Sequence, residues 1–533
     1  MNIDLSSPSD RNLSRVLALQ AQHNGDTCFL ASGEMRYSFK DSNVIVNRYA
    51  SGLKKLGIAA GDRVAIYMGS CVEYVFLTLA INKLGAIWVP INTDYRGDWL
   101  LDSINDSLAQ LIVSDTEHLS ALTKVFAKLN CKKLLVKGDN NKDTLATAYL
   151  SDFDKLDASE PKLDSIHYGD TAAILWTSGT TGKPKGVMQS HNLWICTAES
   201  GIKNFDTRAG DITYNCLPLY NSAAWAANIY RALVAGITCA MDPVFSVTTF
   251  WDRIRYYGAT QTFTLGAMHI FLWQQEPKHN DRDNPLRVAQ MVPMPEELLQ
   301  PFCERFGIEK INQGYGQSEV MSLLNRNSDM TLKANSLGQC HEHLELKLLD
   351  DDGNEVAVGQ TGEFCVRPKK EYIIFNGYFN NPEATEKAYF GEWYRTGDLG
   401  RMDEDGEYFF VDRKNDFIRY KGRNVSSMQV EAVALKHPAV SQAAVVGIPS
   451  EELASEAEIK LDVVLAPGQE VEPVELARFI NDNAPYYFVP RFIELREALP
   501  YTPTNKIQKF KLREMGISSQ TWDMKKSDFR PQR

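Results

Sequence analysis

The chain has 533 residues, of which 44% are hydrophobic and 23% are charged, and its formal net charge is −11. This composition is typical of a globular protein, and the length favours more than one domain. The negative charge gives no reason to expect nucleic acid or an acidic membrane surface as a partner.

No targeting or membrane-spanning segment is predicted. The first residues, "MNIDLSSPSDRN", lack a basic segment followed by an apolar run. The most apolar stretch, residues 74–92, is interrupted by Lys83, Gly85 and Pro90, so we expect a core helix and a strand there. The nine cysteines are scattered and form no C-x-x-C pair, which predicts reduced thiols and a cytoplasmic location.

Short β-rich runs alternate with helical stretches over most of the chain. Residues 63–69 predict a strand, residues 71–85 a helix that ends at a glycine, and residues 86–92 another strand. Further strands are predicted at 109–115, 132–138, 172–178 and 236–242. Alternation of this kind predicts parallel sheets covered by helices.

The pattern changes after about residue 330. Turn signals such as "DDG" and "GQTG" predict antiparallel hairpins, including one over 401–413. We therefore expect an α/β protein with two domains and a boundary at 413–415. The large N-terminal domain (1–413) would combine helix-covered parallel sheets with a small β-barrel-like part, and the C-terminal domain (414–533) would be a small, mobile α+β unit.

The segment "WTSGTTGKPKG" (176–186) is similar to a phosphate-binding loop, but it is not a Walker A loop. Gly179 and Gly182 are separated by only two residues, and Lys183 precedes Pro184, which cannot donate an amide. We expect a mobile arm that closes on phosphates with backbone amides, hydroxyls and a lysine. Its candidate ATP-binding residues are Thr177, Ser178, Gly179, Thr180, Thr181, Gly182, Lys183 and Lys185. Taken alone, the glycines and lysines fit an ordinary flexible loop equally well.

Four further segments follow this loop in order: "QGYGQSE" (313–319), "WYRTGDLG" (393–400), "DRKNDFIRYKGRNVSSMQVE" (412–431) and "LPYTPTNKIQK" (499–509). The ordered set resembles the superfamily of adenylate-forming enzymes, which includes acyl-CoA synthetases, firefly luciferase and nonribosomal peptide adenylation domains. The chain looks most like the carnitine/crotonobetaine-type acyl-CoA ligases. The resemblance implies an ATP-dependent ligase that joins a carboxylic acid to AMP, releases pyrophosphate, and then passes the acyl group to coenzyme A.

The resemblance also assigns roles in the nucleotide site. It implies that Tyr315, followed by Gly316, stacks on adenine and that Glu319 holds Mg²⁺, a cation that prefers oxygen ligands. Ser318 replaces the commoner threonine and keeps the hydroxyl that contacts phosphate.

Three later residues complete the implied nucleotide site. Asp398 matches the aspartate that accepts hydrogen bonds from the ribose hydroxyls, and Arg413 matches an arginine that binds ribose or phosphate. Lys506 matches the adenylation lysine, whose ammonium would bridge the attacking carboxylate and the α-phosphate. Asn505 stands where the family usually has glycine, and asparagine tolerates a left-handed backbone better than most residues.

The second half-reaction is implied to use another surface of the C-terminal domain. Asn415 matches the hinge, where aspartate or lysine is more usual, and Gly422 matches the glycine beside the pantetheine tunnel. Arg419 and Lys421 are candidates for contacts with coenzyme A, although a solvated basic strand explains them equally well.

The acyl pocket departs most from the family pattern. Tyr220 and Asn221 replace a phenylalanine–histidine pair, and the larger residues 290–292 replace a glycine-rich wall. The candidate lining residues are Tyr220, Asn221, Trp225, Met291, Val292 and Gly314. For Trp225, a role in the hydrophobic core is the commoner one. The substrate is expected to be carnitine-like or another small to medium organic acid.

Two other functions remain open. One is adenylation followed by loading of a separate carrier protein; we expect no fused carrier module in this sequence, because the 27 residues after Lys506 are too few for a domain. The other is a non-catalytic nucleotide-binding relative, against which the joint presence of Glu319, Asp398, Arg413 and Lys506 argues. The expected cofactors of the favoured function are ATP, Mg²⁺ and coenzyme A.

Overall fold

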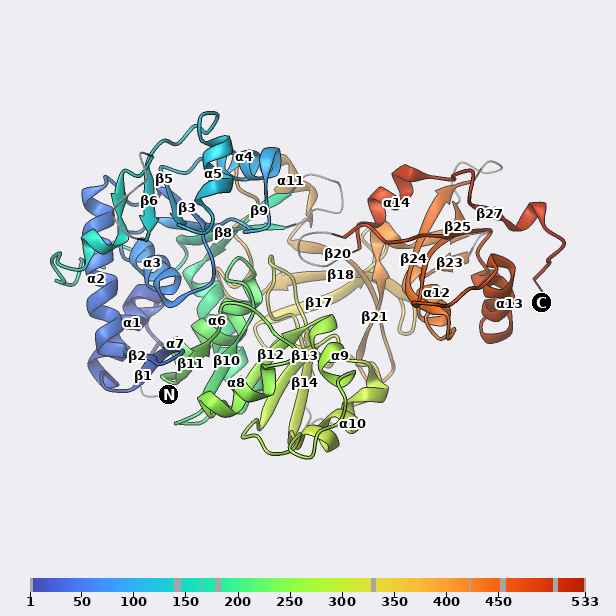
Figure 1. The fold of residues 1–533 in the computed structure, drawn as a ribbon, viewed down its shortest axis with the longest axis horizontal. Coiled ribbons are helices and arrows are strands. Elements are labelled where there is room, and N and C mark those ends of the chain that lie inside the picture. Colours follow the sequence, from blue (N-terminus) through green and yellow to red (C-terminus); the bar gives the residue numbers. More distant parts are fainter. Residues whose placement is uncertain are drawn as a thin grey trace. The chain divides into compact units, whose positions relative to one another are not determined.

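We describe the protein from a computed structural model, which describes residues 3–138, 145–163, 165–177, 184–326, 332–420, 423–450, 457–501 and 507–531 (Figure 1). The chain divides into two compact units. The first unit comprises Met1–Thr177, Lys185–Glu345 and Arg367–Ala388, and the second contains Leu346–Val366 and Tyr389–Arg533. The predicted domain boundary at 413–415 stays a prediction.

A seven-stranded sheet forms one half of the first unit, and it confirms the predicted α/β alternation. Its order is β7-β6-β5-β3-β4-β8-β9, and all neighbours are parallel except β8 and β9. The strands are β3 (Arg63–Tyr67), β4 (Ile87–Pro90), β5 (Leu111–Asp115), β6 (Leu134–Lys137), β7 (Ala148–Tyr149), β8 (Thr171–Thr177) and β9 (Lys185–Ser190). The helices between them are α3 (Val72–Lys83), α4 (Gly97–Asp106) and α5 (Leu119–Phe126).

A nine-stranded sheet forms the other half, in the order β16-β15-β14-β13-β12-β10-β11-β1-β2. The strands are β1 (Cys28–Ser32), β2 (Met35–Ser38), β10 (Ile212–Asn215), β11 (Thr238–Met241), β12 (Gln261–Leu265), β13 (Val288–Val292), β14 (Lys310–Tyr315), β15 (Leu324–Arg326) and β16 (Gln339–Cys340). Its helices are α1 (Leu13–His23), α2 (Phe39–Lys55), α6 (His191–Asn204), α7 (Tyr230–Ala235), α8 (Phe250–Tyr257), α9 (Ala267–Trp273) and α10 (Glu296–Phe306). The central strands are parallel, and antiparallel strands close both edges.

The core of the first unit explains why α3 is apolar on all sides. Every residue of α3 except Glu73 is buried, so this helix is enclosed rather than lying on the surface. Trp88, Trp194 and Trp225 are fully buried in the same cluster, and the ring centroids of Trp88 and Trp225 lie 4.7 Å apart. Helix α2 begins with a capping box between Ser38 and Asp41, which fixes its start against the sheet.

The second unit begins with antiparallel strands. β17 (Leu344–Leu349), β18 (Thr361–Pro368), β20 (Trp393–Met402) and β19 (Tyr389–Phe390) pair in that order, and β21 (Tyr408–Arg413) joins β20. The β20–β21 pair is the hairpin predicted over 401–413, with its turn at 403–407. Helix α11 (Pro382–Lys387) precedes β19 and belongs to the first unit.

The C-terminal part of the second unit is the predicted α+β fold. β22 (Ile418–Tyr420) and β23 (Arg423–Val425) form a hairpin, and β24 (Val440–Pro449), β25 (Ala457–Leu465), β26 (Phe492–Leu495) and β27 (Trp522–Asp523) form a four-stranded sheet. Its helices are α12 (Ser427–Ala434), α13 (Pro473–Asn483) and α14 (Lys509–Met515). β25 and β26 are parallel and are joined through α13, because parallel strands need a crossover connection.

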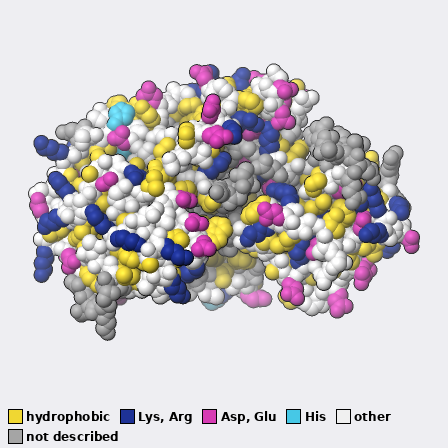
Figure 2. All heavy atoms as spheres, turned by 90° about the horizontal axis from the view of Figure 1, so that it is seen from above, with side chains coloured by type: hydrophobic (Ala, Val, Ile, Leu, Met, Phe, Trp, Pro, Cys, Tyr) yellow, Lys and Arg dark blue, Asp and Glu magenta, His cyan; other side chains and the backbone are white. Residues whose placement is uncertain are grey.

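The surface agrees with the mixed composition. On the face shown in Figure 2, Lys and Arg side chains are interspersed with Asp and Glu side chains. Among the described residues, none of the helices is both long and apolar enough to cross a membrane.

Candidate active site

The antiparallel pair β8–β9 holds the two ends of the predicted phosphate loop. Thr177 lies opposite Lys185 in this pair, and its hydroxyl donates a 3.4 Å hydrogen bond to the Lys185 carbonyl. The remaining loop candidates, Ser178, Gly179, Thr180, Thr181, Gly182 and Lys183, lie outside the described residues. The structure therefore places the ends of the loop, and the phosphate contacts of its centre stay a prediction.

Lys185, Tyr378 and Glu319 form a connected group in the first unit. The Lys185 ammonium lies 4.7 Å from the centre of the Tyr378 ring, and the Tyr378 hydroxyl donates a 2.8 Å hydrogen bond to Glu319 Oε1. Both Tyr378 and Glu319 are buried, at 6% and 8% exposure. A carboxylate that accepts such a bond is held in one orientation. Here it lies next to β9, the strand that follows the phosphate loop.

Tyr378 reaches this position because residues 375–379 pair with β9. The Met188 amide donates to the Gly377 carbonyl at 3.0 Å, and the Phe379 amide donates to the Gly186 carbonyl at 2.7 Å. The Phe375 amide donates to the Glu319 carbonyl at 2.8 Å, which ties the same segment to the motif around Glu319. Tyr378 was not predicted, since nothing near it in the chain indicates a contact 59 positions away.

The "QGYGQSE" segment forms a tight turn after β14. The Tyr315 carbonyl accepts a 3.0 Å bond from the Leu323 amide, which closes the turn. A side chain on Gly316 would place its Cβ 2.3 Å from the Met321 carbonyl oxygen, so only glycine fits there. The buried side chain of Gln189, on β9, donates a 2.7 Å bond to the Ser318 carbonyl and fixes the far side of the turn. This second support was also not predicted.

In the second unit, Asp398 and Arg413 lie directly opposite each other on β20 and β21. Asp398 Oδ1 is 3.7 Å from Arg413 Nε, and the Asp398 side chain is 7% exposed whereas that of Arg413 is 44% exposed. The Asp398 amide donates a 3.2 Å hydrogen bond to the Thr396 hydroxyl. A buried carboxylate beside a half-exposed guanidinium can accept bonds from hydroxyl groups while the guanidinium contacts an anion.

The residues on both sides of the predicted hinge, Asn415, form ion pairs. Before it, Lys414 Nζ lies 2.9 Å from Glu363 and 2.6 Å from Asp351. After it, Asp416 pairs with Arg513 of α14 at 2.9 Å. The side chain of Asn415 lies outside the described residues, so the hinge itself stays a prediction.

Helix α14 is further fixed at its first residue, Lys509. Its ammonium donates to the Ser427 hydroxyl at 2.6 Å and lies 2.8 Å from Glu431. Burial is the first cause that raises the pKa of Glu431, and the Lys509 ammonium opposes this effect. Lys506, Lys421 and Gly422 lie outside the described residues, and the Arg419 side chain does too, although its backbone belongs to β22. The roles of these four residues stay predictions.

The acyl-pocket candidates fall into two groups. The structure places Trp225 and Met291 in hydrophobic clusters with no exposed surface, and Trp225 Nε1 donates a 2.7 Å bond to the Leu219 carbonyl. For Trp225 this is the core role that is the commoner one for a tryptophan. Met291 faces away from Gln290 and Val292 because neighbouring strand residues point to opposite faces. The pocket assignment of these two side chains therefore gains no support.

The other pocket candidates are partly exposed. Tyr220 follows the strand β10, and its burial, together with the carboxylate of Asp94, raises the pKa of its hydroxyl to about 12. Asn221 accepts a 3.0 Å bond from the Ala223 amide. A Cβ on Gly314 would lie 3.1 Å from the side-chain nitrogen Nε2 of Gln290, so these two residues are neighbours on the paired strands β13 and β14. Val292 packs against the main core cluster with part of its surface exposed. For these residues, pocket lining stays a prediction.

A magnesium ion fits the donor present at Glu319. Among the described residues, no group of three or more His, Cys, Asp or Glu side chains could hold a metal ion by itself. Mg²⁺ is usually bound through one or two carboxylates together with substrate phosphates, so a single buried carboxylate near a phosphate loop suits it.

Comparisons with known proteins agree with these features. The AMP-binding enzyme family matches residues 17–379, and the AMP-binding enzyme C-terminal domain matches residues 429–506. The chain is 30% identical to crotonobetaine/carnitine–CoA ligases of Escherichia coli O9:H4 (strain HS) and of Shigella sonnei (strain Ss046), over 89% of this chain and 92% of each relative.

Solved structures of similar fold include the anthranilate CoA ligase AuaEII in complex with anthranoyl-AMP, with a TM-score of 0.83, 25% identity, and coverage of 95% of this chain and 97% of that chain. A fatty acyl CoA synthetase of Mycobacterium tuberculosis has a TM-score of 0.73 and 27% identity, over 96% of this chain and 99% of that chain. The chain therefore belongs to the AMP-binding enzyme family of adenylate-forming enzymes and is an acid–thiol ligase of the acyl-CoA synthetase type.

Proposed function

We propose that the protein is an ATP-dependent carboxylate–CoA ligase. In the first step a carboxylate oxygen attacks the α-phosphorus of ATP, and pyrophosphate leaves as the acyl-adenylate forms. In the second step the thiol of coenzyme A attacks the acyl carbon, and AMP leaves with the oxygen that joined it to the acyl group. The observation that carries the proposal is the group of Lys185, Tyr378 and Glu319 beside the ends of the phosphate loop.

The chain's own residues would mainly position reactants and offset charge, as in other phosphoryl-type transfers. Lys185 offers a cation at the base of the loop, and Tyr315 offers a ring for adenine. Asp398 and Arg413 offer a carboxylate for the ribose and a cation for ribose or phosphate. Lys506 would supply the cation that bridges the attacking carboxylate and the α-phosphate.

Mg²⁺ would be held by Glu319 together with the ATP phosphates, where it neutralises phosphate charge. The Tyr378 hydroxyl would keep the Glu319 carboxylate turned in one direction. Burial of this carboxylate strengthens each electrostatic contact, because little water screens it.

We propose a carnitine-like or another small to medium organic acid as the substrate. The similarity to the crotonobetaine/carnitine–CoA ligases supports this class. A cytoplasmic location is part of the proposal, and it is supported by the nine cysteines, all of which are free thiols.

The experiment is a panel of carboxylic acids with ATP, Mg²⁺ and coenzyme A, read by AMP release and by the mass of the thioester. We expect AMP and thioester in equal amounts with at least one acid, and neither product with the Glu319→Gln variant. Acid-dependent pyrophosphate exchange without any CoA thioester would redirect the assignment to a carrier-protein acceptor. Tight ATP binding without AMP release for every acid would instead indicate a non-catalytic relative.

A further inference from the structure

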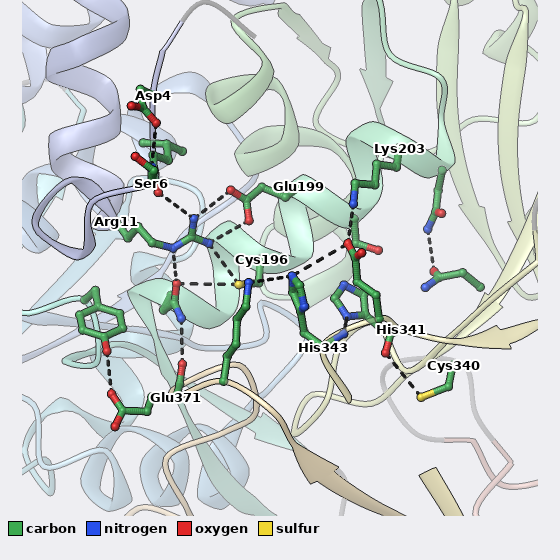
Figure 3. A pocket seen from close by; sticks show the side chains of 18 of the residues that line it. Asp4, Ser6, Arg11, Cys196, Glu199, Lys203, Cys340, His341, His343 and Glu371 are labelled. Carbon is green, nitrogen blue, oxygen red and sulfur yellow. Dashed lines mark hydrogen bonds and ion pairs between the residues drawn. The ribbon is translucent and has the colours of Figure 1, made fainter. Parts of the chain in front are cut away.

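A large cavity in the first unit lies apart from the Lys185–Tyr378–Glu319 group. Its volume is about 1030 Å³, and none of the candidate active-site residues that the structure describes lines it. One face of helix α6 forms its floor, and the other walls come from the segments 3–6, 339–343 and 370–371 (Figure 3). Its size is that of cavities that bind small molecules.

One end of the cavity is closed by Arg11, whose guanidinium makes several hydrogen bonds. Arg11 donates to both carboxylate oxygens of Glu199 at 2.9 and 2.8 Å and to Asn192 at 2.6 Å. It also donates to the Leu5 carbonyl at 3.1 Å and contacts the Cys196 thiol at 3.1 Å (Figure 3). This guanidinium therefore holds the N-terminal segment against α6, and its charge is matched by Glu199.

The opposite end has an excess of cationic groups. Lys203 lies 2.5 Å from Glu342, and Lys370 donates a 2.9 Å bond to the ring nitrogen Nε2 of His343. Glu342 is also 3.9 Å from that ring nitrogen, so its carboxylate lies between Lys203 and His343. Among the described residues, no carboxylate lies within ion-pairing distance of the Lys370 ammonium.

At this end two ammonium groups, those of Lys203 and Lys370, face the single carboxylate of Glu342. Burial and the nearby Lys370 ammonium lower the pKa of His343, and its Nε2 accepts a hydrogen bond from that ammonium. The Glu342 carboxylate shows that an anionic group fits between Lys203 and His343, but its side chain is 57% exposed and that of Lys203 68% exposed. An exposed ion pair of this kind contributes little stability, so a bound anion can replace the Glu342 carboxylate.

The wall beside Arg11 is less polar. The side chains of Leu5 and Cys196 are buried at 6% and 8% exposure and line the cavity beside Ile3. An anion that also carries a short carbon chain would cover this apolar surface, whereas a bare inorganic anion would not.

We propose that this cavity binds a small organic anion, with its carboxylate or phosphate between Lys203 and Lys370 and its carbon chain toward Leu5 and Cys196. This binding does not depend on the proposed ligase reaction, because it involves none of the groups assigned to that reaction.

Two chain segments connect the cavity to Glu319. Asn192, on the cavity floor, donates to the Glu371 carbonyl at 2.9 Å, and the chain from Glu371 continues to Phe375, whose amide binds the Glu319 carbonyl. A second, small void shares Cys196 and His341 with the cavity and is also lined by Val320 and Ser322, immediately after Glu319. Occupation of the cavity is therefore expected to change the rate of the adenylation step, and this part rests on the proposed function.

The test measures binding by calorimetry with butyrate and butyl phosphate, and with butanol as a neutral comparison, each up to about 10 mM. We expect both anions to bind and butanol not to bind, and we expect the Lys203→Ala/Lys370→Ala double variant to weaken binding at least tenfold. The matched control is Lys387→Ala, which removes an exposed lysine that pairs with Glu383 and does not line the cavity. Each titration is repeated with saturating ATP. A ligand that occupies the cavity and not the ATP site should bind equally well in the presence of ATP.

Equal affinity of the double variant and the native protein would overturn the proposal, as would loss of binding when ATP is added. Absence of binding for both anions would overturn it too. For the connection to Glu319, butyl phosphate should change the acid-dependent pyrophosphate exchange of the native protein and not that of the double variant. Unchanged exchange at full occupancy would overturn the connection while the binding result stands.

Discussion

The Tyr378 hydroxyl donates a 2.8 Å hydrogen bond to Glu319 Oε1, and both side chains are buried. Glu319 belongs to a motif whose role is implied by family resemblance, whereas Tyr378 belongs to a segment that carries no such indication in the sequence. Their contact shows that the orientation of the candidate metal-binding carboxylate is set by a residue from a different part of the chain.

The Tyr378→Phe substitution removes this bond and leaves the ring beside Lys185. Hydrogen bonds to charged groups contribute about 1.5–3 kcal/mol, so we expect acid-dependent pyrophosphate exchange to fall roughly tenfold to a hundredfold. The Mg²⁺ concentration that gives half of the maximal rate should rise as well. Tyr256→Phe is the control, because the Tyr256 hydroxyl is exposed and donates to the Gly33 carbonyl. Exchange at the native rate in Tyr378→Phe would show that Glu319 needs no such support.

Lys506→Ala tests the division of the reaction into two half-reactions. If the Lys506 ammonium stabilises the charge that develops as carboxylate attacks phosphorus, the variant should lose nearly all pyrophosphate exchange. It should still form thioester when the acyl-adenylate is supplied. The comparison variant is Lys511→Ala, a nearby lysine with no assigned role. Equal loss of both half-reactions in Lys506→Ala would refute the assignment.

Tyr74→Phe tests the cost of an unpaired hydroxyl in the core. The Tyr74 hydroxyl is buried and has no hydrogen-bond partner among the described residues, so its removal should leave the free energy of unfolding unchanged or raise it by about 1 kcal/mol. Tyr214→Phe is the matched comparison, because the Tyr214 hydroxyl donates a 2.9 Å bond to Asp242 and its loss should be destabilising. The measurement is the urea midpoint followed by tryptophan fluorescence. A midpoint that falls equally in the two variants would contradict this account.

The pair of His118 and Asp115 predicts a pH-dependent contribution to stability. The 2.6 Å bond from His118 Nδ1 to the Asp115 carboxylate is the first cause that raises the pKa of His118. Because the folded-state pKa lies above the unfolded value of about 6.5, the contribution is complete below that pH and is lost as the pH rises through the raised pKa.

His118→Gln should therefore be less stable than the native protein by about 1 kcal/mol at pH 5.5, and the difference should shrink toward pH 8.5. Urea midpoints of the two proteins across this range measure the effect. A difference that does not change with pH would mean that the titration of His118 is not coupled to folding.

Much of the fold follows from local sequence patterns. The strand predicted at 63–69 is β3 (Arg63–Tyr67), and the helix predicted at 71–85 is α3 (Val72–Lys83). Apolar runs of these lengths that are bounded by glycine are typical of a buried strand and a buried helix. The hairpin predicted over 401–413 is present as β20 and β21 for the same reason. Sheet order was not predictable, since the pairing of β10 with both β11 and β12 depends on packing between distant segments.

The candidate active site also has residues that were predicted from the sequence and residues that were not. Glu319 and Asp398 were predicted from short motifs that resemble those of the family, and each is buried beside a charged or polar partner, while their roles stay predictions. Tyr378 and Gln189 could not be identified, since each reaches the "QGYGQSE" turn only through pairing of distant segments. Burial of Met291 in the core was missed because a one-residue change of strand phase moves a side chain to the other face.

The central claim is that the carboxylic acid is activated as an acyl-adenylate. The most direct measurement uses an acid that is active in the panel and is labelled with ¹⁸O in its carboxylate, followed by mass spectrometry of the nucleotide product. Attack of the carboxylate on the α-phosphorus and later cleavage at the acyl carbon predict one ¹⁸O atom in AMP. Release of ADP with the label in inorganic phosphate would contradict the claim, because it would indicate an acyl-phosphate intermediate.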